Sequence, residues 1–179
     1  LLEMLVGELD RVGIRSAVIK HDGHEFEADV PGTDSRRIKE AGAYGTVVYS
    51  GTKFSMTKEQ PSMKAEDFFG FFPEADIIFL EGQKDSDYPK LEVLRREVSD
   101  VPVCRPETVL AYIWSGQIAR SGENTWSGEI AWSGEDCPGR GNRRNGKCPV
   151  LTAAQKDRIL EIVIGHMDRY CRGDGGDEL

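Results

Sequence analysis

The chain lacks a long apolar run, a C-x-x-C pair and an initiator methionine. No uninterrupted apolar stretch approaches the roughly 20 residues of a membrane-spanning helix, so the sequence contains no such segment. Without C-x-x-C pairs, no closed zinc or dithiol redox motif is recognisable among its 4 cysteines. We therefore expect unpaired thiols at Cys104, Cys137, Cys148 and Cys171, with a Cys137–Cys148 clamp by metal or disulfide as the alternative.

Positive charge is also in short supply. Lys and Arg total 23 against 31 Asp and Glu, which gives a formal net charge of −8 and disfavours binding to nucleic acid or an anionic membrane. With 39% hydrophobic residues, the 179-residue chain fits one soluble domain with an ordinary core. Its first residues lack the basic start and small-residue cleavage site of a signal peptide, so we expect a cytoplasmic protein.

The N-terminal segment has the apolar period of a helix. The repeat comprises Leu1, Leu2, Leu5, Val6, Leu9 and Val12, and Gly13 can end the helix. No Ser, Thr, Asp or Asn precedes Leu1 to cap it. A helix that begins in phase and uncapped favours a truncated chain, with a processed N-terminus as the alternative.

Further along, short strands alternate with helices. Strands are expected over residues 16–20, 46–49, 53–57, 77–80, 91–94 and 101–103, with 46–57 as a hairpin. Residues 77–80 are continuously apolar, as in a strand buried on both faces. Helices are expected over 34–41, around Phe68 to Phe72 with Ser62 as cap, and from Thr152, whose spacing to Gln155 is that of a capping box. This order predicts an α/β fold with a mostly parallel sheet flanked by helices.

Residues 112–150 differ in composition from the rest. They contain four hexads, WSGQIA, RSGENT, WSGEIA and WSGEDC, followed by a Gly-rich basic stretch. We interpret them as a poorly ordered insertion loop, with a small ribbon as the alternative. Residues 141–148 nearly spell a phosphate loop, but Cys148 replaces the hydroxyl residue and no strand precedes them. The expected organisation is therefore a core over 1–111, the insertion over 112–150, a C-terminal helix over 151–173 that packs on the core, and a flexible tail over 174–179.

Two strand ends carry candidate site residues. Glu81 follows the apolar strand and precedes Gly82, where a backbone can approach a ligand closely. One carboxylate in that position can hold Mg²⁺, which keeps most of its waters. The alternative is a solvated Glu81 or one paired with Lys84 or Lys90.

The other strand end leads into a loop rich in titratable groups: His21, Asp22, His24, Glu25, Glu27 and Asp29. Loops beyond the carboxyl ends of strands bind ligands in open α/β sheets, so His21 is a ligand-facing candidate. His21 and His24 together could bind a metal, although their spacing matches no closed zinc pattern. Thr33-Asp34-Ser35, at a helix start, can receive a phosphate or a base edge through free backbone N–H groups, although the Asp34 carboxylate opposes direct phosphate contact unless a cation intervenes. The alternative is a plain cap.

Two motifs resemble the molybdopterin-guanine dinucleotide biosynthesis adapter (MobB) family. They are VIKHDGHEFEADVPGTDSRRIKEAGA and IIFLEGQKDSDYPKLEVLR, in which Gln83 replaces the usual Phe. The resemblance implies a P-loop NTPase-like fold whose first strand and phosphate loop are absent from this chain. It also implies binding of GTP and Mg²⁺, slow GTP hydrolysis at most, and a cytoplasmic homodimer. The implied partners are the molybdopterin guanylyltransferase and molybdopterin, with no nucleic acid or membrane.

Matched by position, the resemblance puts Glu81 at the magnesium ion and Gly82 beside it, with His21 and Asp34 lining the nucleotide mouth. Because phosphate-loop amides supply most of the grip on a nucleotide, we expect weak binding in this form. Two alternatives stay open: a metal-inserting nucleotide hydrolase that uses His21 and His24, and a nucleotide-free scaffold that recruits partners through its three tryptophans.

Overall fold

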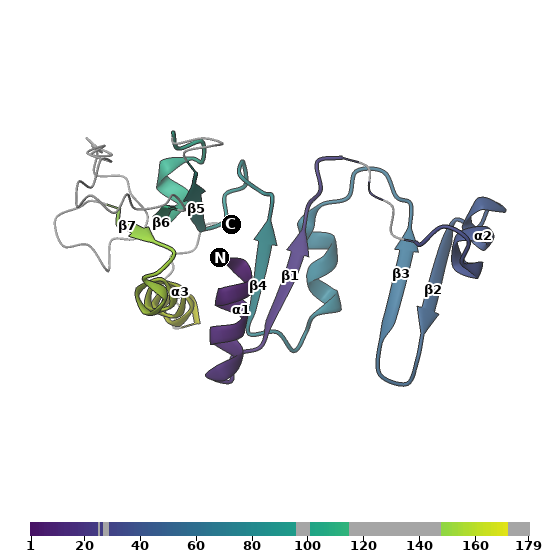
Figure 1. Ribbon diagram of the computed structural model, residues 1–179, viewed down its shortest axis with the longest axis horizontal. Coiled ribbons are helices and arrows are strands. Elements are labelled where there is room, and N and C mark those ends of the chain that lie inside the picture. Colours follow the sequence, from purple (N-terminus) through teal and green to yellow (C-terminus); the bar gives the residue numbers. More distant parts are fainter. Residues whose placement is uncertain (25, 27–28, 96–100, 115–147, 172–179) are drawn as a thin grey trace. The chain divides into compact units, whose positions relative to one another are not determined.

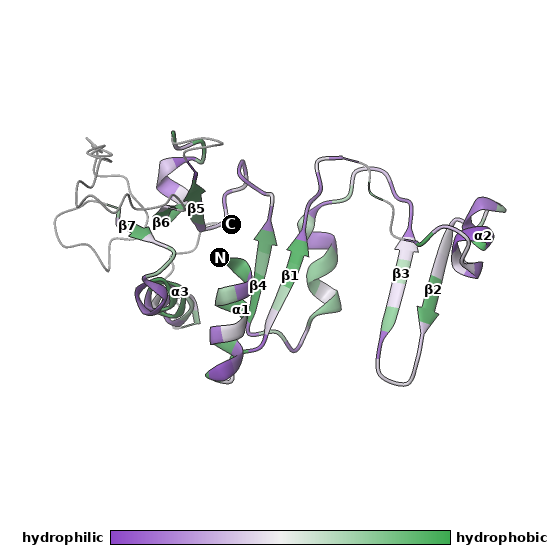
Figure 2. Ribbon diagram, in the orientation of Figure 1, coloured by the Kyte–Doolittle hydropathy of each residue, from purple (hydrophilic) through white to green (hydrophobic). Residues whose placement is uncertain are grey.

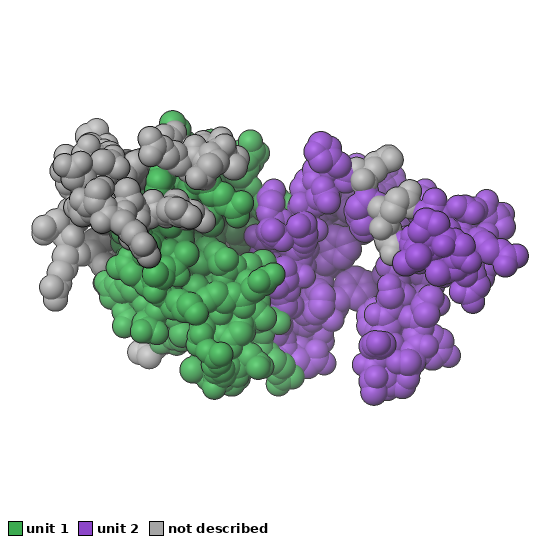
Figure 3. All heavy atoms as spheres, viewed as in Figure 1, with its two compact units in different colours: residues 1–16, 83–179 green, residues 17–82 purple. Residues whose placement is uncertain are grey.

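The computed structural model describes residues 1–24, 26, 29–95, 101–114 and 148–171. The chain divides into two compact units, shown in different colours in Figure 3. Residues 1–16 and 83–179 form the first unit, and residues 17–82 form the second. Each unit is described by itself.

A three-stranded parallel sheet is the centre of the first unit (Figure 1). It contains β5 (Lys90–Leu94), β6 (Val109–Trp114) and β7 (Val150–Thr152), with β6 in the middle. Glu92 pairs with Tyr112 in register, and Ile113 pairs with Leu151. A short 3-10 helix, η2 (Pro106–Thr108), leads into β6.

Two amphipathic helices complete this unit. α1 (Leu2–Arg11) contacts α3 (Lys156–Cys171), and α3 contacts β6. Leu5 and Leu9 of α1 are buried at i,i+4 spacing, as the apolar period predicted. The uncapped start of α1 and its end before Gly13, which has φ +80°, are likewise confirmed. Every buried hydrophobic residue in the described part of the chain belongs to this unit: Leu5, Leu9, Leu94, Val109, Ala111, Tyr112, Ile113, Leu151, Ile159, Ile162 and Val163.

The predicted capping box before α3 forms only in part. The Thr152 N–H donates to Gln155 Oε1 at 2.8 Å, as such a box requires. The Thr152 hydroxyl lies 3.4 Å from the same oxygen, and the Gln155 N–H bonds the Thr152 carbonyl instead of that hydroxyl. The helix begins at Lys156.

The second unit contains two separate strand pairs. β1 (Ser16–Lys20) pairs with β4 (Ile77–Glu81), and their arrows run the same way in Figure 1. β2 (Gly45–Tyr49) and β3 (Phe54–Lys58) form an antiparallel hairpin, as predicted. The unit also holds α2 (Asp34–Glu40) and the 3-10 helix η1 (Ala65–Phe71). The predicted helix over 34–41 is thus confirmed to within one residue.

Several sequence predictions were wrong in detail. Residues 101–103 are not a strand, whereas β6 and β7, which lie partly inside the expected insertion, were missed. The phenylalanine-rich helix is 3-10, and it follows Lys64, whose N–H donates to the Asp67 carboxylate; Ser62 has φ +58° and does not cap it. β4 is mostly apolar and green in Figure 2, but its residues 77–80 are half-buried, not buried on both faces.

Residues 115–147, which include most of the hexads and Cys137, lie outside the described part of the chain. Trp114, the first hexad residue, is the last residue of β6.

Candidate functional site

His21 and Glu81 meet at one edge of the β1–β4 pair. The N–H of His21, the residue that follows β1, donates at 2.9 Å to the carbonyl oxygen of Glu81, the last residue of β4. The carboxyl ends of neighbouring parallel strands share one edge of a sheet, which is where ligands bind in open α/β folds. The sequence therefore placed these two residues correctly, although their binding roles stay predictions.

The Glu81 carboxylate remains accessible to a ligand. Its side chain is 50% exposed, and its Oε2 lies 3.6 Å from Lys20 Nζ. This pairing with Lys20 replaces the expected alternatives Lys84 and Lys90. An exposed ion pair is worth little, typically about 0–1 kcal/mol, so a cation or a phosphate can displace it readily.

Lys20 is the site neighbour that the sequence analysis missed. As the last residue of β1, it stands one position before His21 and thus at the same strand end. Its position at the end of the predicted strand 16–20 could have identified Lys20 as a site residue from the sequence.

Gly82 is required by the protein's own backbone. Its φ is +86°, and a Cβ at this position would lie 2.5 Å from the His21 carbonyl oxygen. Left-handed φ and such a close approach both favour glycine. The sequence suggested a close approach to a ligand, but the structure shows a close approach of the β4 end to the β1 end.

The loop after β1 is open to solvent. His21 and His24 are exposed, and the His24 N–H donates to Asp22 Oδ1 at 3.3 Å. Glu25 and Glu27 lie outside the described residues. In the described ranges, no group of three or more His, Cys, Asp or Glu side chains is arranged to hold a metal ion.

Asp34 lies on a different element from His21 and Glu81. It is the first residue of α2, and its Oδ1 accepts from the Ser35 N–H at 2.9 Å. Thr33 occupies the cap position, but its hydroxyl donates to the Val30 carbonyl and does not cap the helix. No hydrogen bond or ion pair between described residues joins Asp34 to His21 or Glu81. The structure thus brings together three of the four predicted site residues.

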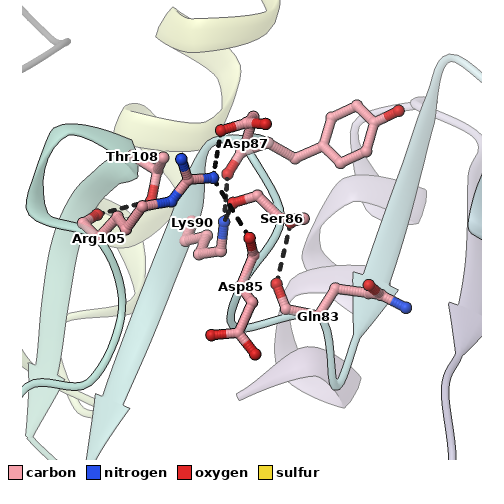
Figure 4. A network of polar contacts seen from close by, with 8 residues as sticks. Gln83, Asp85, Ser86, Asp87, Lys90, Arg105 and Thr108 are labelled. Atoms are coloured by element: carbon pink, nitrogen blue, oxygen red, sulfur yellow. Dashed lines mark hydrogen bonds and ion pairs between the residues drawn. The ribbon is translucent and has the colours of Figure 1, made fainter.

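In the other unit, Lys90 belongs to a network of polar contacts (Figure 4). Its ammonium donates to the carbonyl oxygens of Ser86 and Tyr88, the latter at 2.9 Å. Arg105 donates to the Asp85 carbonyl at 3.2 Å and to the Asp87 carboxylate. Burial is the main cause that lowers the pKa of Lys90, and the nearby Cys104 opposes it. The network connects the loop over residues 83–88 to Lys90 of β5 and to Arg105.

The family profile described as molybdopterin guanine dinucleotide synthesis protein B matches residues 1–115. The chain belongs to this family. The adapter protein of molybdopterin-guanine dinucleotide biosynthesis from Haemophilus influenzae is 32% identical over 102 residues, which are 55% of this chain and 57% of that protein. Its counterpart from Escherichia coli is 32% identical over 100 residues, 53% of this chain and 57% of that protein. The chain thus matches little more than half the length of these curated relatives.

Solved MobB structures share the fold. Bacillus subtilis MobB superposes with a TM-score of 0.60 at 19% identity, covering 92% of this chain and 86% of that one. A MobB homologue from Bacillus stearothermophilus gives 0.51 at 16% identity, covering 93% and 87%. The predicted α/β fold is therefore confirmed, and it is the fold of solved MobB structures. No helix in the described residues is both long and apolar enough to cross a bilayer.

Proposed function

We propose that this chain acts in the cytoplasm as an adapter in molybdopterin guanine dinucleotide biosynthesis. The family match over residues 1–115 supports this role most directly. In this role it binds GTP and Mg²⁺ and assists the guanylyltransferase that joins GMP to molybdopterin. Hydrolysis of GTP by the chain itself is slow at most.

The β1–β4 edge supplies the proposed nucleotide site. Glu81 suits Mg²⁺, because its carboxylate is half-exposed and its ion-pair partner among the described residues is the exposed Lys20. Mg²⁺ would neutralise phosphate charge beside this edge when it is bound. His21, exposed next to Glu81, contacts the nucleotide, and Gly82 keeps the two strand ends close enough for both contacts. Asp34, exposed at the start of α2 in the same unit, is the second contact proposed for the mouth of the site.

Nucleotide binding with and without Mg²⁺ tests this site. We expect a fluorescent GTP analogue to bind weakly and Mg²⁺ to strengthen that binding. Glu81→Gln should remove most of the Mg²⁺ effect, on the order of tenfold in affinity, while His21→Ala should weaken binding at either Mg²⁺ level. Glu161→Gln is the matched control, because Glu161 is an exposed carboxylate paired with Arg158 on α3. Binding that is indifferent to Mg²⁺ and to Glu81→Gln would refute the assignment.

Partner action needs its own measurement. Purified guanylyltransferase, loaded with molybdopterin and GTP, should form the dinucleotide faster when this chain is added. An equal rate without the chain would contradict the adapter role, whatever the nucleotide affinity.

The β2–β3 hairpin supports a homodimer. Its apolar side chains Val47, Val48, Tyr49, Phe54 and Met56 are exposed, and Tyr49 reaches 80%. Consecutive strand residues point to opposite faces, so both faces of this two-stranded sheet are apolar. Exposed apolar patches and unpaired strand edges mark association surfaces, and a second copy of the hairpin offers a self-complementary one.

Light scattering after gel filtration tests the dimer. We expect a dimer for the unmodified chain and a monomer for Tyr49→Glu. Tyr170→Glu is the matched control, because Tyr170 is 68% exposed on α3 of the other unit. If the dimer persists in Tyr49→Glu but is lost in Tyr170→Glu, the interface does not involve the hairpin, and the proposed dimer surface is wrong.

A further inference from the structure

Two cysteines in the first unit lie against one small buried cluster. Leu94, Val109 and Tyr112 form the cluster, each at most 2% exposed, and both Cys104 and Cys148 pack against it. Neither cysteine is in a disulfide, and both are half-buried, whereas Cys171 is exposed. Neither cysteine belongs to the site at the β1–β4 edge.

The sheet holds these cysteines at the entrances of two neighbouring strands. Cys104 lies before η2, which leads into β6, and Cys148 lies just before β7. Val150 of β7 pairs in parallel with Tyr112 of β6, and the same register carried back two residues places Cys148 beside Leu110, near the start of β6. The Tyr112 N–H donates to the Pro149 carbonyl at 3.0 Å, and the Cys148 thiol donates to the Val109 carbonyl at 3.4 Å. Cys148 is thereby fixed beside the start of β6.

Cys104 is fixed from the β5 side. Glu92 of β5 is only 6% exposed, and its Oε1 accepts from the backbone N–H groups of Val103 and Cys104 at 2.6 and 3.1 Å. These bonds hold the segment before η2 against the sheet. The two thiols therefore approach the same three side chains from segments 44 positions apart in the sequence.

We propose that Cys104 and Cys148 form a reversible disulfide that links the segment entering β6 to the segment entering β7. The oxidant is a small disulfide such as oxidised glutathione. One protein thiolate attacks it, forms a mixed disulfide and releases one glutathione thiolate. The second protein thiolate then attacks the protein sulfur, closes the bond and releases the second glutathione. Two protein thiols are oxidised, one small disulfide is reduced to two thiols, and the two protons pass to these thiols.

The surroundings of Cys104 give the reaction a pH dependence. Burial raises the pKa of Cys104, the Glu92 charge raises it further, Asp85 adds to this, and only Lys90 opposes it. Since the thiolate is the reacting form, Cys104 reacts slowly at neutral pH and faster as the pH rises.

Peptide mapping after oxidation tests the proposal. The full chain is incubated with oxidised glutathione, remaining thiols are alkylated, and the digest is analysed by mass spectrometry. We expect one peptide pair joining Cys104 to Cys148, a mass lower by about 2 Da for the protein, and reversal by dithiothreitol. The cross-link should vanish in Cys104→Ser and Cys148→Ser and persist in Cys171→Ser and Cys137→Ser.

The unmodified chain decides the proposal even if a serine variant fails to fold. A Cys137–Cys148 or Cys148–Cys171 link in its place would overturn it. So would two separate glutathione adducts on Cys104 and Cys148, because the Cα atoms of a disulfide must come within about 4.4–6.8 Å of each other.

Discussion

At the residue scale, single backbone contacts decide the shape of the site edge. Gly82 combines a left-handed φ with a close approach to the His21 carbonyl, while Gly13 has a similar φ and open space around it. Comparing the two glycines separates two reasons for glycine: the left-handed φ, which both share, and the lack of space for a Cβ, which applies to Gly82 alone. The close approach to His21 is sufficient reason for a glycine after Glu81, and no ligand is needed to explain it.

Gly82→Ala should lower the free energy of unfolding more than Gly13→Ala does. The left-handed conformation costs a non-glycine residue about 1–2 kcal/mol in both variants. The clash with the His21 carbonyl adds about 1–3 kcal/mol at Gly82 alone. Urea denaturation followed by circular dichroism measures both changes. An equal loss of unfolding free energy in the two variants would contradict this, because it would show that the ends of β1 and β4 can separate at no energetic cost.

Glu92 is the most buried charged residue in the described part of the chain. Its Oε1 serves two backbone N–H groups, and its Oε2 is buried without a partner there. Glu92→Ala leaves both N–H groups unpaired and should destabilise the chain by about 2–4 kcal/mol. Glu92→Gln keeps an acceptor oxygen and should lose less. Chemical denaturation of both variants checks the order, and a greater loss for Gln would contradict the proposed role of Oε1.

At the element scale, the helices with an apolar period and the strands β1 to β5 were predicted from the sequence, whereas β6 and β7 were missed. α1 and α3 carry long apolar repeats, and the β2–β3 hairpin has a short turn between two strands, so the sequence identified them. β6 was missed because Val109 to Trp114 ran into the hexad repeat, whose composition suggested a loop. Val101 to Val103 looked like a strand. It is not one, because the backbone N–H groups of Val103 and Cys104 donate to the buried Glu92 carboxylate.

His166 gives α3 a pH dependence. Burial, and to a lesser degree Arg169, lowers the pKa of His166 below the ordinary 6.5. The unfolded chain therefore takes up this proton first as the pH falls, so the stability contributed by neutral His166 is complete above pH 6.5 and is lost below it. We expect the melting temperature of the unmodified chain to fall more between pH 7 and pH 5 than that of His166→Gln. Parallel pH profiles would contradict this.

At the scale of the whole molecule, the buried hydrophobic residues are unevenly shared. All those in the described ranges lie in the unit of residues 1–16 and 83–179, and none lies in residues 17–82. The site edge and the apolar hairpin both belong to the second unit. That unit has little buried core to stabilise it alone, so a ligand or a second copy would raise its stability markedly.

Hydrogen exchange should reveal this asymmetry. Amides of β6 and of the middle of α3 should exchange slowly, whereas those of β2 and β3 should exchange faster at low protein concentration. Raising the concentration should slow exchange in β2 and β3 and leave β6 unchanged, because only the hairpin is expected to associate. Uniform protection of both units at every concentration would contradict the assignment of the core to one unit.

The sequence by itself determined the α/β class, the helices with apolar periods, the hairpin, and the meeting of His21 and Glu81. These features depend on local patterns and on the rule that parallel strands end at one edge. Only the tertiary structure decided that Lys20 pairs with Glu81, that Gly82 fits against His21, and that Cys104 and Cys148 pack against one cluster. Such contacts join residues far apart in the chain, and their energies depend on packing and burial that no local pattern encodes.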